Sequence, residues 1–184
     1  VVIGGWVPTF LFPAAESPHI GSLDIDLALD FRKIPDAAYR TILASLRDGG
    51  FVQDPGQPFR FYRTASGPND VRITVEVDLM AGEYGGTGRR KRTQRVQDTR
   101  ARKARGCDLA FEDSVPVSLE GAWPDGGKDK VTFRVAGIVP FLVMKGMALH
   151  DRKKEKDAYD IWYCIDRYAG RLETLSAAFT PFVD

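Results

Sequence analysis

The 184-residue sequence is poor in cysteine and histidine, with Cys107, Cys164, His19 and His150 as its complete set. Two cysteines so far apart do not make the framework of a disulfide-rich domain, and two histidines cannot complete a Cys/His zinc cluster. No stretch approaches the roughly 18 apolar residues that a membrane-spanning helix needs. The sequence therefore excludes these three classes and predicts a protein of the reducing cytoplasm without a membrane partner.

An excess of charge of one sign is also lacking, because 26 Lys and Arg oppose 25 Asp and Glu, for a net charge of +1. One segment departs from this balance, with nine cations at Arg89, Arg90, Lys91, Arg92, Arg95, Arg100, Arg102, Lys103 and Arg105. We interpret the glycine-rich residues 82–88 before it as a hinge, since no Gly-Lys-Ser/Thr ending of a phosphate-binding loop is present. The segment is either a solvated charged face or a grip for the phosphate backbone of an RNA.

Hydrophobic periodicity predicts an α+β fold, a mixed β-sheet with flanking helices and a helical C-terminal part. Residues 1–184 are read as one domain, with a sheet-rich core over 1–139 and C-terminal helices over 140–184. Strands are predicted over 1–3, 22–30, 59–63, 71–79, 115–119 and 131–135. Helices are predicted over 36–47, 140–150 and 155–168, with one or two helical turns over 6–12.

Acidic side chains mark one face of the strand predicted over 22–30. Asp24 and Asp26 alternate there with apolar residues at positions 23, 25, 27 and 29, so both carboxylates project from the same face. Asp78 lies near the end of a second alternating strand, predicted over 71–79. Glu76, on the same polar face, is the alternative candidate for the third acid. Carboxylates this close repel one another, and a divalent cation removes the repulsion. The pattern predicts a magnesium site, with the solvated face of an edge strand as the alternative.

Four short motifs accompany these acids in a fixed order along the chain. They are Gly4-Gly5, Ser22-Leu23-Asp24-Ile25-Asp26-Leu27, Val77-Asp78-Leu79 and Lys156-Asp157-Ala158-Tyr159-Asp160-Ile161. The series resembles that of the AbiEii-type nucleotidyltransferases, which belong to the DNA polymerase β-like superfamily. The resemblance spans most of the chain. It departs from the family pattern at Ile20, where many relatives carry an arginine, and the neighbouring His19 replaces that charge only in part.

The resemblance implies a nucleotidyltransferase-like fold and transfer of a nucleoside monophosphate from an NTP to an acceptor hydroxyl, with Mg²⁺ or Mn²⁺ as cofactor. It implies catalytic and metal-binding roles for Asp24, Asp26 and Asp78. It implies nucleotide-binding roles for Gly4, Gly5, Ser22, Lys145, Lys156, Asp157 and Asp160. An RNA or tRNA acceptor would meet the basic segment at Arg89, Arg90, Lys91, Arg92 and Arg95. Relatives that act as toxins in toxin–antitoxin or phage-defence systems also imply a cognate antitoxin.

Purely structural roles remain open as alternatives for the C-terminal residues. Lys145 interrupts an apolar helix, so its amine either reaches the surface or points into a site. Residues 153–157 fit a solvated, ion-paired helix face equally well. For the whole protein, the alternative function is a non-catalytic nucleotide- or RNA-binding module on the same fold. A metal-dependent nuclease that uses the same acids ranks below both.

Overall fold

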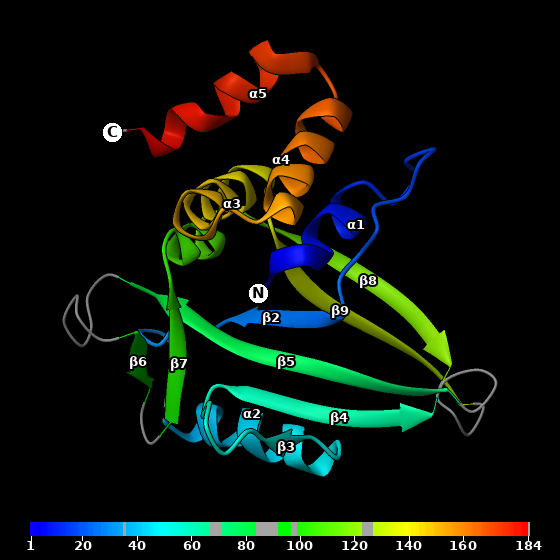
Figure 1. Cartoon of the computed structure of the whole chain (residues 1–184), viewed down its shortest axis with the longest axis vertical. Helices are drawn as coiled ribbons and strands as arrows, with labels where there is room; N and C mark the ends of the chain where they lie inside the picture. Colours follow the sequence, from blue (N-terminus) through cyan, green and yellow to red (C-terminus); the bar gives the residue numbers. More distant parts are fainter. Residues whose placement is uncertain (35, 67–70, 84–91, 97–98, 123–126, 184) are drawn as a thin grey trace.

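The computed structural model describes residues 1–34, 36–66, 71–83, 92–96, 99–122 and 127–183. It confirms the α+β class, with a mixed sheet of nine strands and a helical C-terminal part (Figure 1). The strands are β1 (Val2–Ile3), β2 (Asp24–Ala28), β3 (Val52–Gln53), β4 (Arg60–Ser66), β5 (Arg72–Gly82), β6 (Thr93–Val96), β7 (Thr99–Ala104), β8 (Ser114–Ala122) and β9 (Lys128–Ala136). The helices are α1 (Val7–Leu11), α2 (Asp36–Asp48), α3 (Ile138–Arg152), α4 (Glu155–Arg167) and α5 (Arg171–Phe179), with 3-10 turns η1 (Gly4–Trp6), η3 (Cys107–Phe111) and η4 (Thr180–Phe182).

The sheet has the order β3-β4-β5-β2-β1-β9-β8, and β7 joins it through β5 while pairing with β6. Strand β5 is the hub, since β4 lies antiparallel to it and both β2 and β7 lie parallel to it. The parallel β2–β5 register sets Asp24 beside Glu76 and Asp26 beside Asp78. Residues paired in register point to the same face, so the acidic faces predicted for two separate strands form one acidic surface.

Two hydrophobic clusters cover opposite faces of the sheet. The first packs against α1, α3 and α4 and includes the buried side chains of Val7, Phe141 and Tyr163. The second contains Phe61 and Leu79 and packs against the partly buried hydrophobic residues of α2. Figure 1 shows the same division, with α3, α4 and α5 above the sheet and α2 below it. The C-terminal helices therefore lie on the face opposite α2.

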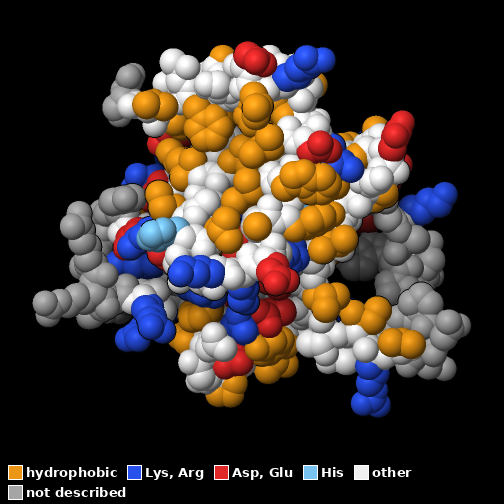
Figure 2. All heavy atoms as spheres, turned by 45° about the horizontal axis from the view of Figure 1, so that its top comes forward, with side chains coloured by type: hydrophobic (Ala, Val, Ile, Leu, Met, Phe, Trp, Pro, Cys, Tyr) orange, Lys and Arg blue, Asp and Glu red, His pale blue; other side chains and the backbone are white. Residues whose placement is uncertain are grey.

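The predicted apolar faces are shorter than their alternation suggested. Leu23 precedes β2 and is 83% exposed, although the pattern placed it on the buried side. Val71 and Ile73 are also exposed, because this part of β5 extends beyond its pairing with β2 and has β4 as its paired neighbour. Further hydrophobic side chains, among them Trp162 and Leu172, lie on the surface of the C-terminal helices (Figure 2).

Both cysteines are free and buried, as a chain without a disulfide framework requires. Burial, followed in each case by a nearby aspartate, raises the pKa of the Cys107 and Cys164 thiols to about 12. Thiols with such a high pKa are packing residues rather than nucleophiles. Within the described ranges, no helix has the length and apolar character to cross a bilayer.

Several elements carry no clear sequence signal. Strands β6 and β7 form within the segment interpreted from its charge alone, and α5 follows the last predicted helix. In β7 a fully buried Ala101 lies between the basic residues Arg100 and Arg102. One small apolar residue among cations is too weak a pattern to predict a strand.

We expect Phe61→Ala to lower the free energy of unfolding by about 3–4 kcal/mol, because it empties a fully buried aromatic site in the second cluster. Urea unfolding followed by circular dichroism measures the change. Arg63→Ala on the same strand is the matched control, since Arg63 is exposed, and its effect is expected to stay within about 0.5 kcal/mol. Equal losses in the two variants would contradict the packing described for this face.

Candidate functional site

A single cleft of about 840 Å³ collects most of the residues singled out from the sequence. Its volume lies in the range of small-molecule sites. The predicted residues that line it are Gly4, Gly5, Ser22, Asp24, Asp26, Asp78, Arg92, Lys145, Lys156 and Asp157. Three further cations of the basic segment also line it, namely Arg102, Lys103 and Arg105. Arg60, Arg152 and Lys154 line it as well and were not predicted as site residues. The cleft therefore places an acidic strand surface opposite a basic wall.

The acidic surface is poorly compensated at Asp26. Burial, then the neighbouring charges of Asp24 and Asp78, raises the pKa of Asp26 to about 7. Over the described part of the chain, no side chain donates a hydrogen bond to this carboxylate or forms an ion pair with it. A bound divalent cation would supply the missing positive charge.

Asp78 is compensated by an arginine that the sequence analysis missed. Arg60 lies directly across from it in the β4–β5 register. The guanidinium donates from Nε to Asp78 Oδ1 and from Nη2 to Asp78 Oδ2, both at 2.7 Å. Arg60 Nη2 also lies 2.7 Å from Glu76 Oε1. Among the described residues no arginine forms an ion pair with Asp24 or Asp26, whereas Arg60 holds Asp78.

The Gly4-Gly5 turn fits closely against the acidic strand. Gly4 has a left-handed backbone (φ 74°), and a Cβ there would lie 2.0 Å from Asp26 Oδ2. A Cβ on Gly5 would lie 2.8 Å from Ser22 Oγ and 3.1 Å from Lys156 Nζ. The Ser22 hydroxyl in turn donates a hydrogen bond to Asp24. Two glycines therefore bring backbone against the acids at a point where a ligand phosphate could also approach.

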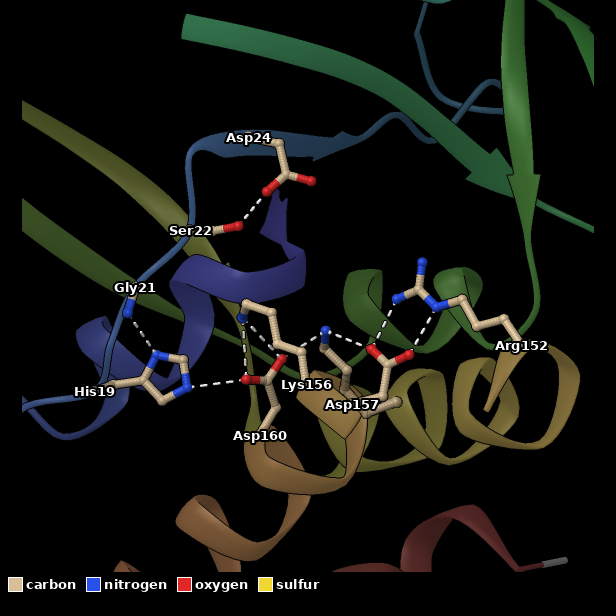
Figure 3. A network of polar contacts seen from close by, with 9 residues as sticks. His19, Gly21, Ser22, Asp24, Arg152, Lys156, Asp157 and Asp160 are labelled. Carbon is tan, nitrogen blue, oxygen red and sulfur yellow. Dashed lines mark hydrogen bonds and ion pairs between the residues drawn. The ribbon is translucent and has the colours of Figure 1, made fainter. Parts of the chain in front are cut away.

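A buried ion network underlies the basic wall, as Figure 3 shows. Lys145 Nζ on α3 lies 3.0 Å from Asp157 Oδ1 and 2.7 Å from Asp160 Oδ2 on α4. Arg152 also bonds Asp157 at 2.6 Å, and Lys156 lies 3.1 Å from Asp160. Burial opposes ionisation of Asp157, but hydrogen bonds from Arg152 and Lys145 outweigh it and lower its pKa. Asp160 does not line the cleft; it lies fully buried behind the lysines and holds them.

His19 ties the loop before β2 to this network. Its Nδ1 accepts a hydrogen bond from the Gly21 N–H at 3.0 Å, so the other ring nitrogen carries the proton and donates to Asp160 Oδ1 at 3.0 Å. Burial lowers the pKa of His19 despite the Asp160 carboxylate, so the ring stays neutral near pH 7. Tyr163 fixes the same loop by donating to the Ser17 carbonyl at 2.9 Å. His19 thus has a positioning role at the loop before β2.

The basic segment is placed only in part. Arg92 lines the cleft, and β7 contributes Arg102 and Lys103 to it. Arg95 belongs to β6, and its side chain lies outside the described atoms. Arg89, Arg90 and Lys91 lie outside the described residues.

Arg60 and Arg152 are two cleft residues that the sequence analysis missed, although their spacing in the sequence indicates both contacts. Strands β4 and β5 follow one another along the chain, and counting outward from the pair Ser66 and Arg72 reaches Arg60 and Asp78. Arg152 stands five residues before Asp157, across a turn between two predicted helices. The Arg60–Asp78 and Arg152–Asp157 contacts can each be predicted once the connection between the two elements that carry them is known.

Comparison of the chain with protein-family models, with curated proteins and with solved structures finds no match in any of the three. Among the described residues, no group of three or more His, Cys, Asp or Glu side chains is already arranged as a metal site. The residues of the cleft, and the likeness of their motifs to those of the AbiEii-type nucleotidyltransferases, are therefore the observations that bear on function.

We expect Asp160→Asn to lower the free energy of unfolding by roughly 3 kcal/mol, because it removes the charge of a fully buried carboxylate that pairs with Lys145 and Lys156. Thermal and urea unfolding measure the loss. Glu120→Gln is the control, since it breaks the exposed Glu120–Lys130 pair at a cost of less than about 1 kcal/mol. A loss no larger than that of the control would mean that the network does not hold α3 and α4 together.

The pKa of Asp26 gives a pH-dependent prediction. Its folded pKa of about 7 lies above the ordinary aspartate pKa of 3.8, so between these values the folded state holds a proton that the unfolded state has lost. Stability contributed by the protonated carboxyl is complete at low pH and declines as pH rises toward 7. Asn imitates the protonated group, so Asp26→Asn should match the parent near pH 4 and exceed it by roughly 3 kcal/mol near pH 8 without divalent cations. A stability difference that does not vary with pH would contradict the raised pKa.

Proposed function

We propose that this protein is a magnesium-dependent nucleotidyltransferase, which moves a nucleoside monophosphate from an NTP to an acceptor hydroxyl. The observation that carries the proposal is the shared face of Asp24, Asp26 and Asp78 on two parallel strands, opposite Lys145 and Lys156 in one cleft. Acids on one wall and cations on the other suit a substrate that brings both a divalent cation and a polyphosphate. The order of motifs along the chain supports the same reaction.

The carboxylates fit a divalent cation by their chemistry. Asp24 and Asp26 offer hard oxygen ligands from the same strand face, and the raised pKa of Asp26 reports an uncompensated negative charge there. Asp78 is the third ligand in this proposal. Bound Mg²⁺, or Mn²⁺ in its place, would polarise the phosphoryl group and neutralise charge on the leaving pyrophosphate.

The residues of the chain then have distinct tasks. The backbone at Gly4 and Gly5 lets phosphate oxygens approach the acids, and the Lys156 ammonium lies beside the same turn. Lys145, fixed by two aspartates, meets the triphosphate as a preorganised cation. The acceptor oxygen attacks the α-phosphorus, the bond to pyrophosphate breaks, and the hydroxyl proton passes toward Asp78.

The acceptor we propose is RNA, with tRNA as one candidate. Arg92, Arg102 and Lys103 line the cleft from the β6–β7 side, so a phosphate backbone running along these strands would deliver a terminal hydroxyl to the acids. A role as a toxin or in phage defence, and a cognate antitoxin as partner, rest on the motif resemblance.

One observation favours a second candidate, a non-catalytic nucleotide- or RNA-binding module. Both oxygens of Asp78 accept hydrogen bonds from Arg60, whereas no arginine in the described part of the chain bonds Asp24 or Asp26. Such a module would bind NTP and RNA in the same cleft without turnover. Nucleotide binding without label transfer, under conditions that satisfy the metal requirement, would distinguish it from the enzyme.

The test is a transfer assay with each of the four α-³²P-labelled NTPs, Mg²⁺ or Mn²⁺, and a cell extract that contains RNA and protein. We expect label on a nuclease-sensitive macromolecule, and a loss of at least about a hundredfold in the Asp24→Asn/Asp26→Asn variant. The matched control is Glu120→Gln/Asp129→Asn, which removes two exposed carboxylates from the β8–β9 hairpin and should leave transfer unchanged. Label transfer that persists in the Asp24/Asp26 variant would overturn the proposed site.

A further inference from the structure

Arg60 occupies the position that a metal would need at Asp78. Its fork binds both carboxylate oxygens of Asp78, each at 2.7 Å, a bidentate geometry that is the strongest form of this contact. The Asp78 side chain is almost fully buried and the Arg60 side chain is 20% exposed, so solvent competes little for the pair. Each oxygen of Asp78 gives one lone pair to the guanidinium, and these are the two lone pairs that a bidentate cation would use.

Asp26 shows what the same environment does to an acid without such a partner. It lies beside Asp78 in the β2–β5 register and shares its strand face. Among the described residues no side chain donates a hydrogen bond to Asp26, whereas Arg60 donates one to each oxygen of Asp78. The negative charge on β5 is thus balanced by a bound arginine, whereas within the described residues the negative charge on the adjacent strand β2 is not balanced in this way.

We propose that Arg60 is a resident counter-ion that competes with the divalent cation for Asp78 and thereby sets the metal affinity of the cleft. The inference rests on the proposed function, since it assigns Asp78 as a metal ligand. In the metal-free protein Arg60 holds Asp78, and a divalent cation binds all three acids only when the guanidinium withdraws.

Glu76 makes the withdrawal feasible. Its Oε1 already lies 2.7 Å from Arg60 Nη2, the same nitrogen that reaches Asp78. Glu76 is two residues before Asp78 on β5 and is more exposed, at 24% of its side chain. A guanidinium that leaves Asp78 therefore keeps a carboxylate partner and moves toward solvent, so the exchange leaves no buried charge unpaired.

The experiment measures Mn²⁺ affinity, by electron paramagnetic resonance of the free ion, in the protein without nucleotide. Arg60→Ala should bind Mn²⁺ more tightly by roughly tenfold, because the ion no longer displaces a charge-assisted bidentate contact. Arg60→Lys should fall between Arg60→Ala and the parent, since a lysine engages one oxygen at a time.

Arg102→Ala is the matched control. Arg102 carries the same charge, lines the same cleft, and lowers the pKa of Asp26 through its field without a hydrogen bond to Asp26. If Arg60 acted only through its charge, the two variants would tighten Mn²⁺ binding equally, and the competition would be refuted. We expect less than about threefold from Arg102→Ala, the size of a screened field effect. Should Arg60→Ala fail the circular dichroism test of folding, Arg60→Gln replaces it with the same expectation.

The outcomes separate this inference from the proposed function. Mn²⁺ binding that Asp26→Asn abolishes, and that Arg60→Ala leaves equal or weaker, would refute the competition while keeping the metal site. Absence of Mn²⁺ binding from the parent and from every Arg60 variant would refute the metal site, and the competition with it. Tightening in Arg60→Ala well beyond Arg102→Ala supports both.

Discussion

The parallel pairing of β2 with β5 is the constraint on which the rest of the structure depends. It places Asp26 beside Asp78 and Asp24 beside Glu76 on one face, where four carboxylates repel one another in partly buried surroundings. Folding tolerates this arrangement only if positive charge arrives from elsewhere. The β4 strand, the β6–β7 pair and the C-terminal helices all deliver cations to the same cleft. Elements from several parts of the chain therefore bring positive charge to one cluster of carboxylates.

The cations arrive in two physically different forms. Lys145 and Lys156 are held by buried aspartates, a network that costs desolvation and is retained where geometry matters. Arg102 lies among the basic residues of β7. It acts on Asp26 through the electric field of its charge rather than through a fixed contact. A rigid pair suits a small substrate of fixed shape, and a broad basic strip suits an extended polyanion. The cleft therefore holds fixed cations beside a broader basic strip.

Local patterns in the sequence predicted more of the fold and site than long-range ones. Alternation predicted β2, β5 and the common face of Asp24 and Asp26, because it depends on neighbours two residues apart. The role of Arg60 was missed, since it follows from a hairpin register that alternation does not fix. The strand β7 was hidden because cations surround its buried Ala101. The predicted burial of Leu23 was wrong for a third reason, because β2 begins one residue after the alternating pattern does.

The contact between His19 and Asp160 spans 141 residues of sequence, and β1 likewise pairs with the distant strand β9. Contacts of such separation form late, because the intervening loop must close before they are made. During synthesis on the ribosome, the strand that bears Asp24 emerges well before helix α4. A nascent chain would thus display the acids without the lysines that face them. The cleft is therefore complete only once α4 has emerged and has packed against α3.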